Sequence, residues 1–228
     1  MTIKYHPAVV QGSDEWRALR CGLITASEVS LLVTPKTLAA ANNDKSRAHI
    51  YELTAQRISQ YVEPSYISSD MLRGYDEELL ARDAYVEHYS PVTEVGFVTN
   101  DKWGFTIGYS PDGLVGDDGL IEAKSRAQKY QVQTLLEHQH AGTIPSDFVL
   151  QVQTGLLVSE RKWLDFLSYS GGLPMAVIRG YPDTAMQDAI VDACRAAELA
   201  IAENLKQYAA ATRGLIPTKR REYEDMRI

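Results

Sequence analysis

The chain has 228 residues, of which 45% are hydrophobic and 23% are charged, and its formal net charge is −7. A chain of this length buries roughly 70% of its unfolded surface, so we expect one domain over residues 1–228. The negative charge excludes nucleic-acid binding by bulk electrostatics alone, but it allows a local basic track. The sequence contains no apolar run as long as a membrane span, no recognisable secretory signal and no cysteine framework, because its two cysteines lie far apart. We therefore expect a cytoplasmic protein with no membrane partner.

Helical patterns dominate the first ninety residues. Thr25 and Glu28 have the spacing of a capping box, so a helix is expected to begin near Thr25 and to carry Ser27 in its first turn. The other expected helices are at 13–20, from 44 onward and at 71–89.

The middle of the chain changes to the residue types of β-strands, and helices then return. The expected strands are 93–100, 103–110, 120–124, 163–170 and 175–181, and the expected helices are 128–140, 146–159 and about 183–211. This order predicts an α/β or α+β fold with a central mixed β-sheet of about five strands flanked by helices.

Two charged side chains lie inside the expected strand at 120–124. Because side chains alternate along a strand, Glu122 and Lys124 project from the same face. Asp112 ends the preceding turn and joins them if that turn packs beside the strand. Carboxylates held close together repel each other unless a cation lies between them, and a site with only oxygen ligands favours Mg²⁺ or Mn²⁺. A neighbouring lysine can orient water and offset charge on a phosphate, so this trio suits metal-assisted phosphodiester hydrolysis.

An ordered set of short motifs surrounds these residues. The set consists of Trp16, Leu19-Arg20, GLITAS at 22–27, Gly74 to Glu78 with Ala81-Arg82, SPDG at 110–113, Glu122 to Lys124, and QVQ at 151–153. In these motifs, over about residues 11–170, the chain resembles the PD-(D/E)xK nucleases. Within them it is similar to the lambda-type phage exonucleases, the YqaJ-like viral recombinase group. The resemblance implies a restriction-endonuclease-like core, whereas the C-terminal helix and the charged tail carry no motif of the family.

The resemblance also implies a role for each matching residue of the catalytic centre. Asp112 and Glu122 would ligate the metal ions, and Lys124 would position the attacking water. Glu78 would join the metal site or its water shell. Gln151 would support the site from its own helix, since only one glutamine of the QVQ motif can face it.

Four further residues are implied to contact DNA. Arg20 and Ser27 match positions that hold a terminal 5′-phosphate, and Ser110 belongs to the same DNA-binding set. The expected helix N-terminus at Thr25 agrees with an anion at Ser27, because free backbone N–H groups and the helix dipole favour negative charge there. Met71 matches an apolar wedge that separates the strands, although it also suits a core position. Other basic residues that a DNA track could use are Arg17, Arg126, Lys129, Arg161, Lys162 and Lys219-Arg220-Arg221.

Taken together, the resemblance implies a Mg²⁺-dependent 5′-to-3′ exodeoxyribonuclease, for which Mn²⁺ can substitute. It would act on linear double-stranded DNA with a 5′-phosphate end, release mononucleotides and leave a 3′ single strand. It further implies a homotrimeric ring and a single-strand annealing protein as partner, in the bacterial host of a phage or prophage. Two alternatives stay open, a restriction-type endonuclease with the same metal site and a non-catalytic DNA-binding recombination module.

Overall fold

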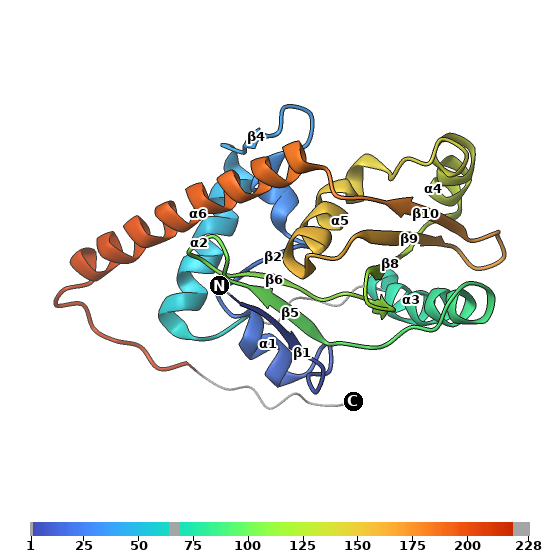
Figure 1. Ribbon diagram of the computed structural model, residues 1–228. Helices are drawn as coiled ribbons and strands as arrows, with labels where there is room; N and C mark the ends of the chain where they lie inside the picture. Colours follow the sequence, from blue (N-terminus) through green and yellow to red (C-terminus); the bar gives the residue numbers. More distant parts are fainter. Residues whose placement is uncertain (1, 64–68, 221–228) are drawn as a thin grey trace.

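The computed structural model describes residues 2–63 and 69–220, which form a mixed α/β protein as expected (Figure 1). The helical elements are α1 (Asp14–Arg20), η1 (Val29–Leu31), α2 (Asp44–Ser59), α3 (Ser69–His88), α4 (Gln128–Gln133), η2 (Thr134–Gln139), α5 (Ser146–Ser159) and α6 (Thr184–Ala211). The strands are β1 (Ile3–His6), β2 (Ile24–Thr25), β3 (Val33–Thr34), β4 (Ala39–Ala40), β5 (Phe97–Asn100), β6 (Ile107–Tyr109), β7 (Gly113–Val115), β8 (Gly119–Ser125), β9 (Trp163–Tyr169) and β10 (Ala176–Gly180).

Most helices begin where the sequence predicts, because short polar side chains cap them. Ser13 Oγ accepts a hydrogen bond from Trp16 N at the start of α1. Asn43 and Ser46 form a reciprocal capping box at the start of α2, and Asp183 caps α6. The helix expected over 128–140 is α4 followed by the π-helical turn η2. In the part of the chain that the structure describes, no helix is both long and apolar enough to cross a bilayer.

The strands form two four-stranded sheets and a two-stranded ladder, where one sheet of about five strands was expected. The first sheet has the order β1-β5-β6-β2 and the second β10-β9-β8-β7. Both are mixed, because β2 runs parallel to β6 and β8 runs parallel to β9 while the other pairs are antiparallel. The additional strands of the two four-stranded sheets, β1, β2 and β7, have four, two and three residues, which is too short to show alternation in the sequence.

The helix predicted to begin at Thr25 is wrong. Ile24 and Thr25 are strand β2, which pairs with β6, and the side chain of Ile24 is fully buried. Thr25 Oγ1 donates to Glu28 Oε2 at 2.7 Å, so this pair makes a side-chain contact within a turn. Only the short 3₁₀ turn η1 follows. Two consecutive β-branched residues fit a buried strand better than a helix start, and tertiary pairing decided the outcome.

Helix α5 lies beside both four-stranded sheets and carries one side of the core (Figure 1). Its buried residues include Leu150, Val152 and Leu156. At Gly155 the helix approaches the ring of Tyr109 so closely that an added Cβ would lie 2.7 Å from Tyr109 Cζ. The missing side chain therefore leaves room for the Tyr109 ring on β6.

Helix α3 is fixed on the opposite face of the second sheet by a buried carboxylate. Asp165 on β9 is 2% exposed and accepts a hydrogen bond from Tyr85 Oη at 2.7 Å. Arg179 on β10 donates two more bonds to Asp165, at 2.7 and 2.8 Å. Removing one hydrogen-bond partner from a buried charged group costs free energy, so such a group keeps its partners in fixed positions. This contact holds the helix that carries Glu78.

Candidate active site

Strand β8 presents Glu122 and Lys124 on one face, as strand alternation predicts. Lys124 Nζ lies 2.7 Å from Glu122 Oε1, and the Glu122 side chain is 2% exposed. The backbone N–H of Ala123, between them, donates to Asp112 Oδ2 at 2.7 Å. Asp112 precedes β7, which pairs antiparallel with β8 and so brings the SPDG turn beside the strand. The three charged residues therefore converge at one place.

Burial and mutual repulsion set the charges of this group. Burial raises the pKa of Asp112 well above its ordinary value, and the negative charge of Glu122 raises it further, against the opposing effect of Lys124. Burial alone would lower the pKa of Lys124, but the attraction of Glu122 and Asp112 outweighs it and raises that pKa. Lys124 is consequently a cation near neutral pH, suited to binding and orienting groups and unsuited to accepting a proton.

Each carboxylate oxygen of Glu122 accepts a hydrogen bond from a neutral side chain. Gln151 Nε2 on α5 donates to Glu122 Oε1, and Tyr109 Oη on β6 donates to Oε2 at 2.8 Å. Gln153 instead donates to the backbone oxygen of Tyr181, so only the first glutamine of the QVQ motif faces the site. These donors fix the orientation of the Glu122 carboxyl group.

Glu78 reaches the same region from helix α3. It is partly buried, and burial raises its pKa while Lys124 lowers it and Glu122 raises it. Glu78 lies at the edge shared by two hollows in the surface. One, of about 340 Å³, is also lined by Asp112, and the other, of about 370 Å³, is also lined by Lys124. The acidic centre is thus open to a ligand on both sides of Glu78.

The carboxylate groups at this site fit a hard divalent cation whose remaining ligands come from water and substrate. Asp112, Glu122 and Glu78 all offer carboxylate oxygens. Over residues 2–63 and 69–220, no three His, Cys, Asp or Glu side chains gather closely enough to hold a metal ion by themselves. Mg²⁺ is commonly bound by one or two carboxylates, with water and substrate phosphate supplying the remaining oxygens. Glu122 raises the pKa of both Asp112 and Glu78, and such repulsion between carboxylates is what a bound cation relieves.

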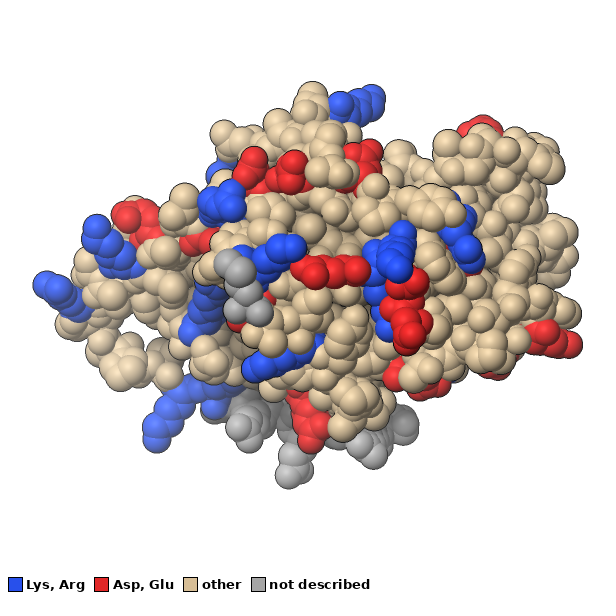
Figure 2. Space-filling view, in the orientation of Figure 1, with Lys and Arg blue, Asp and Glu red and all other residues tan. Residues whose placement is uncertain are grey.

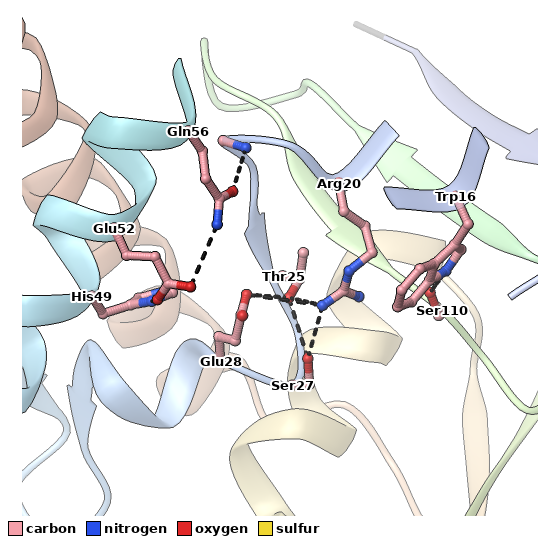
Figure 3. A network of polar contacts seen from close by, with 10 residues as sticks. Trp16, Arg20, Thr25, Ser27, Glu28, His49, Glu52, Gln56 and Ser110 are labelled. Carbon is pink, nitrogen blue, oxygen red and sulfur yellow. Dashed lines mark hydrogen bonds and ion pairs between the residues drawn. The ribbon is translucent and has the colours of Figure 1, made fainter. Parts of the chain in front are cut away.

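Arg20 lies at the end of α1 and points toward the turn after β2 (Figure 3). Its Nη2 lies 3.2 Å from Thr25 Oγ1 and 3.5 Å from Ser27 Oγ. Glu28 Oε2 is 4.0 Å away, and the guanidinium carbon lies 4.3 Å from the centroid of the Trp16 ring. A partly buried guanidinium beside two hydroxyl groups is suited to an anion, which can accept from all three.

The anion argument that used a helix N-terminus at Ser27 is wrong, because Ser27 lies in a turn between β2 and η1. What remains is the contribution of Arg20 and the hydroxyl groups. Ser110 belongs to the same region, since Trp16 Nε1 donates to Ser110 Oγ at 2.8 Å (Figure 3). Ser110 is two residues before Asp112, so the Arg20 group adjoins the acidic centre.

Met71 is on the surface of α3, with 40% of its area exposed, and it lines the same hollow as Lys124. The core position considered for it is therefore wrong. Its side chain lies at the edge of the site.

On the face drawn in Figure 2, the basic side chains of the described residues do not form one continuous field, because Lys and Arg are interspersed with Asp and Glu. Several candidates for a DNA track are neutralised locally: Arg17 pairs with Asp14 at 2.8 Å, and Lys162 pairs with Asp118 at 2.9 Å. Arg221 lies outside the described residues. Contact with a polyanion is therefore expected at individual cations near the site.

Three residues near the acidic centre were not singled out as members of the site by the sequence, namely Tyr109, Glu77 and Arg126. Tyr109 directly precedes the SPDG motif, and Arg126 follows Lys124 by two positions, so proximity to the motifs was the available signal. Glu77 gave no signal, because its partners come from β8 and from the turn after β9.

Comparison with known proteins gives a consistent result. Residues 15–162 match the YqaJ-like viral recombinase domain. An alkaline exonuclease from Laribacter hongkongensis has 29% sequence identity and a TM-score of 0.76, over 90% of this chain and 100% of that one. The same enzyme in complex with dAMP has 30% identity, the same TM-score and the same coverage. A phage-related exonuclease from Haemophilus somnus shares the fold, with a TM-score of 0.59 at 10% identity over 82% of this chain and 96% of that one. A search of curated proteins gave no match.

Proposed function

Because the chain belongs to the YqaJ-like viral recombinase family, we propose that it is a Mg²⁺-dependent exodeoxyribonuclease. It would digest one strand of linear double-stranded DNA from the 5′ end and release mononucleotides. The observation that carries this proposal is the convergence of Asp112, Glu122 and Lys124 where β7 and β8 meet. The exonuclease relative from Laribacter hongkongensis, at about 30% identity over 90% of this chain, supports the activity, and its complex with dAMP supports a mononucleotide product.

The residues of the site divide the work of hydrolysis among them. Asp112 and Glu122, with Glu78, would hold Mg²⁺ or Mn²⁺, which supplies positive charge to the reacting phosphate. Lys124, as a cation, would orient the attacking water and offset charge that develops on the phosphate oxygens. Gln151 and Tyr109 would keep Glu122 correctly oriented.

The polarity of digestion rests on the group around Arg20. A terminal 5′-phosphate carries more negative charge than an internal phosphate, and it is less hindered. Arg20, Ser27 and Ser110 offer donors beside the acidic centre, so a terminal phosphate bound there would position the following linkages near Asp112. Met71 would meet the base pair that opens as the strand enters.

The family relationship supports further expectations for this chain. We propose a homotrimeric ring that encloses the DNA, a single-strand annealing protein that receives the 3′ strand, and a place of action in the host cytoplasm. The homotrimer is testable by the mass of the purified protein in solution, and the partnership by coprecipitation of the two proteins.

The decisive experiment is digestion of linear duplexes labelled at either end, with 5′-phosphate or 5′-hydroxyl termini and with closed circular DNA in parallel. A charge-assisted hydrogen bond is worth about 1.5–3 kcal/mol, so a 5′-phosphate should accelerate digestion roughly tenfold or more. Arg20→Ala should remove most of that preference, whereas the control Arg17→Ala should keep it, because Arg17 is exposed and paired with Asp14.

The other outcomes decide between the alternatives. Efficient cutting of closed circles would favour the restriction-type endonuclease. Binding without cleavage of any substrate, at any Mg²⁺ or Mn²⁺ concentration, would favour the non-catalytic recombination module.

A further inference from the structure

The hollow of about 370 Å³ beside Lys124 is lined on one side by residues to which no catalytic role has been assigned. Arg126, Tyr130 and Phe148 line it on the side away from Glu78's helix. Arg126 follows β8, Tyr130 is on α4 and Phe148 is on α5, so three separate elements meet there.

Arg126 is held firmly but incompletely partnered. Its backbone N–H donates to Tyr169 O at 2.7 Å, which continues the β8–β9 pairing past the end of the strand. Its guanidinium carbon lies 5.0 Å from the centroid of the Tyr130 ring and 4.8 Å from that of Phe148. Its Nε is buried and has no hydrogen-bond partner among the described residues. Burial lowers the pKa of Arg126, with Asp147 acting against this effect.

Such an arrangement is costly unless a ligand completes it. A buried N–H without an acceptor costs free energy, and Arg126 Nε has no acceptor among the described residues. Lys129 Nζ lies 4.7 Å from the centroid of the same Tyr130 ring, so a second cation stands near. Tyr130 is 44% exposed and can stack on a flat group. Cations interleaved with an accessible aromatic ring are the means by which proteins bind single nucleic-acid strands.

The position of the hollow relative to the acidic centre indicates which part of a DNA strand would bind there. Arg20 lies over the ring of Trp16, and Trp16 Nε1 donates a hydrogen bond to Ser110 Oγ. Ser110 is two residues before Asp112, whose carboxylate accepts a hydrogen bond from the backbone of β8. Lys124 and Arg126 come after Glu122 on and beyond the same strand. Asp112 lies on the edge of β8 that pairs with β7, whereas the backbone of Arg126 bonds to Tyr169 on the edge that pairs with β9. The Arg20 group and Arg126 therefore approach the acidic centre from different edges of β8.

We propose that this hollow is a binding subsite for the nucleotide unit next to the scissile phosphate, on the side away from Arg20. Its phosphate lies against Arg126 and its base against Tyr130. The inference rests on the proposed function, because it takes the acidic centre as the place of cleavage.

The test is a coupling experiment between one cation and one phosphate. Binding is measured by fluorescence anisotropy in an Asp112→Asn background, so that DNA stays intact. The probes are a 5′-phosphorylated duplex and a set in which one linkage at a time, starting from the 5′ end, is a neutral methylphosphonate. Arg126→Ala is compared with Lys162→Ala, an exposed lysine paired with Asp118, and with Arg126→Lys, which keeps the charge. Thermal melts establish that each variant is folded.

We expect Arg126→Ala to weaken binding of the unmodified duplex about tenfold or more, the loss of one charge-assisted contact, while Lys162→Ala has little effect. At one internal linkage the methylphosphonate should weaken binding by the Asp112→Asn parent but add nothing once Arg126→Ala is also present, and Arg126→Lys should recover part of the affinity. If every linkage is additive with Arg126→Ala, or if the loss equals that of Lys162→Ala, the subsite is overturned. Because this assay needs no cleavage, failure of the proposed nuclease activity would appear separately, in digestion by the unsubstituted protein.

Discussion

Ser125 Oγ donates a short hydrogen bond to Glu77 Oε2, which joins helix α3 to the end of strand β8. The other oxygen of Glu77 accepts from the backbone N–H of Gly171 at 3.2 Å, in the turn between β9 and β10. Glu77 is adjacent to Glu78 in the chain. These two bonds therefore fix the turn of α3 from which the Glu78 carboxylate reaches the acidic centre.

The first prediction is that Glu77→Ala raises the Mg²⁺ concentration needed for half-maximal nuclease activity severalfold. Without Glu77, the turn that carries Glu78 loses two bonds, each worth about 1 kcal/mol, and one oxygen of the metal site becomes less well placed. Glu77→Gln keeps an acceptor oxygen and should recover part of the effect. Asp76→Ala, an exposed neighbour on the same helix, is the matched control. An unchanged Mg²⁺ requirement in Glu77→Ala would mean that α3 is positioned without this contact.

The second prediction concerns Tyr109, whose hydroxyl group is the donor to Glu122 Oε2. Tyr109→Phe keeps the ring in the space beside Gly155 but leaves that oxygen short of a donor in a buried setting. Losing a hydrogen bond to a buried charge costs about 1.5–3 kcal/mol. We expect turnover to fall roughly tenfold while the KM for DNA changes little. Tyr5→Phe, which removes a hydroxyl that donates to Ser159 O far from Glu122, should leave turnover unchanged.

The sequence predicted the parts of the site that depend on local geometry. Strand alternation placed Glu122 and Lys124 on one face, and their spacing from Asp112 allowed the convergence that the structure has. The same reasoning failed at Thr25, because the capping-box pattern is local whereas the pairing of β2 with β6 is not. No local pattern reports that a neighbouring strand is available.

Contacts between elements far apart in the sequence were beyond prediction for a similar reason. Gln151 and Gln153 differ only in which side of α5 they occupy, so the sequence indicated that one faces the site without deciding which one by geometry. The structure turns Gln151 toward Glu122. Glu77 sits among other acidic residues on α3 and becomes distinct only through Ser125, 48 positions later.

The third prediction tests the acidic centre directly. Asp112→Ala or Glu122→Ala should lower the rate of hydrolysis by a factor of roughly 10² or more, since removal of a group that stabilises the transition state typically has that effect. Activity of the unsubstituted protein should disappear on chelation and return with Mg²⁺ or Mn²⁺. Digestion that persists in chelator, or a fully active Asp112→Ala protein, would show that hydrolysis does not use this centre.

Substitutions of Lys124 test the basic residue of the same acidic centre. Lys124→Ala should reduce turnover by a similar factor while binding of DNA falls much less, because the ammonium group is held at Glu122 and acts on the reacting groups. Lys124→Arg keeps the charge but not the point geometry, so it should recover little activity. A loss confined to DNA binding would reassign Lys124 to holding the substrate.

The last prediction is a dependence of stability on pH that reverses the usual behaviour of a carboxylate. The folded-state pKa of Asp112 is raised, chiefly by burial and then by Glu122, above the value of about 3.9 of an unfolded aspartate. Between those two pKa values the folded chain holds a proton that the unfolded chain has released. Raising the pH through that window therefore lowers the free energy of unfolding, and Glu78, whose pKa is raised in the same direction, adds to the effect.

Asp112→Asn isolates the contribution of this one carboxyl group. The amide oxygen can still accept from the backbone N–H of Ala123, but it carries no charge to repel Glu122. Measured by thermal melts in chelator, the variant should match the unsubstituted protein near pH 4. Its melting temperature should then exceed that of the unsubstituted protein by a margin that grows with pH and becomes constant above the folded-state pKa of Asp112. Adding Mg²⁺ at high pH should stabilise the unsubstituted protein more than the variant, because only the unsubstituted protein retains both carboxylates. A melting-temperature difference that stays the same from pH 4 to pH 9 would contradict a raised pKa at Asp112.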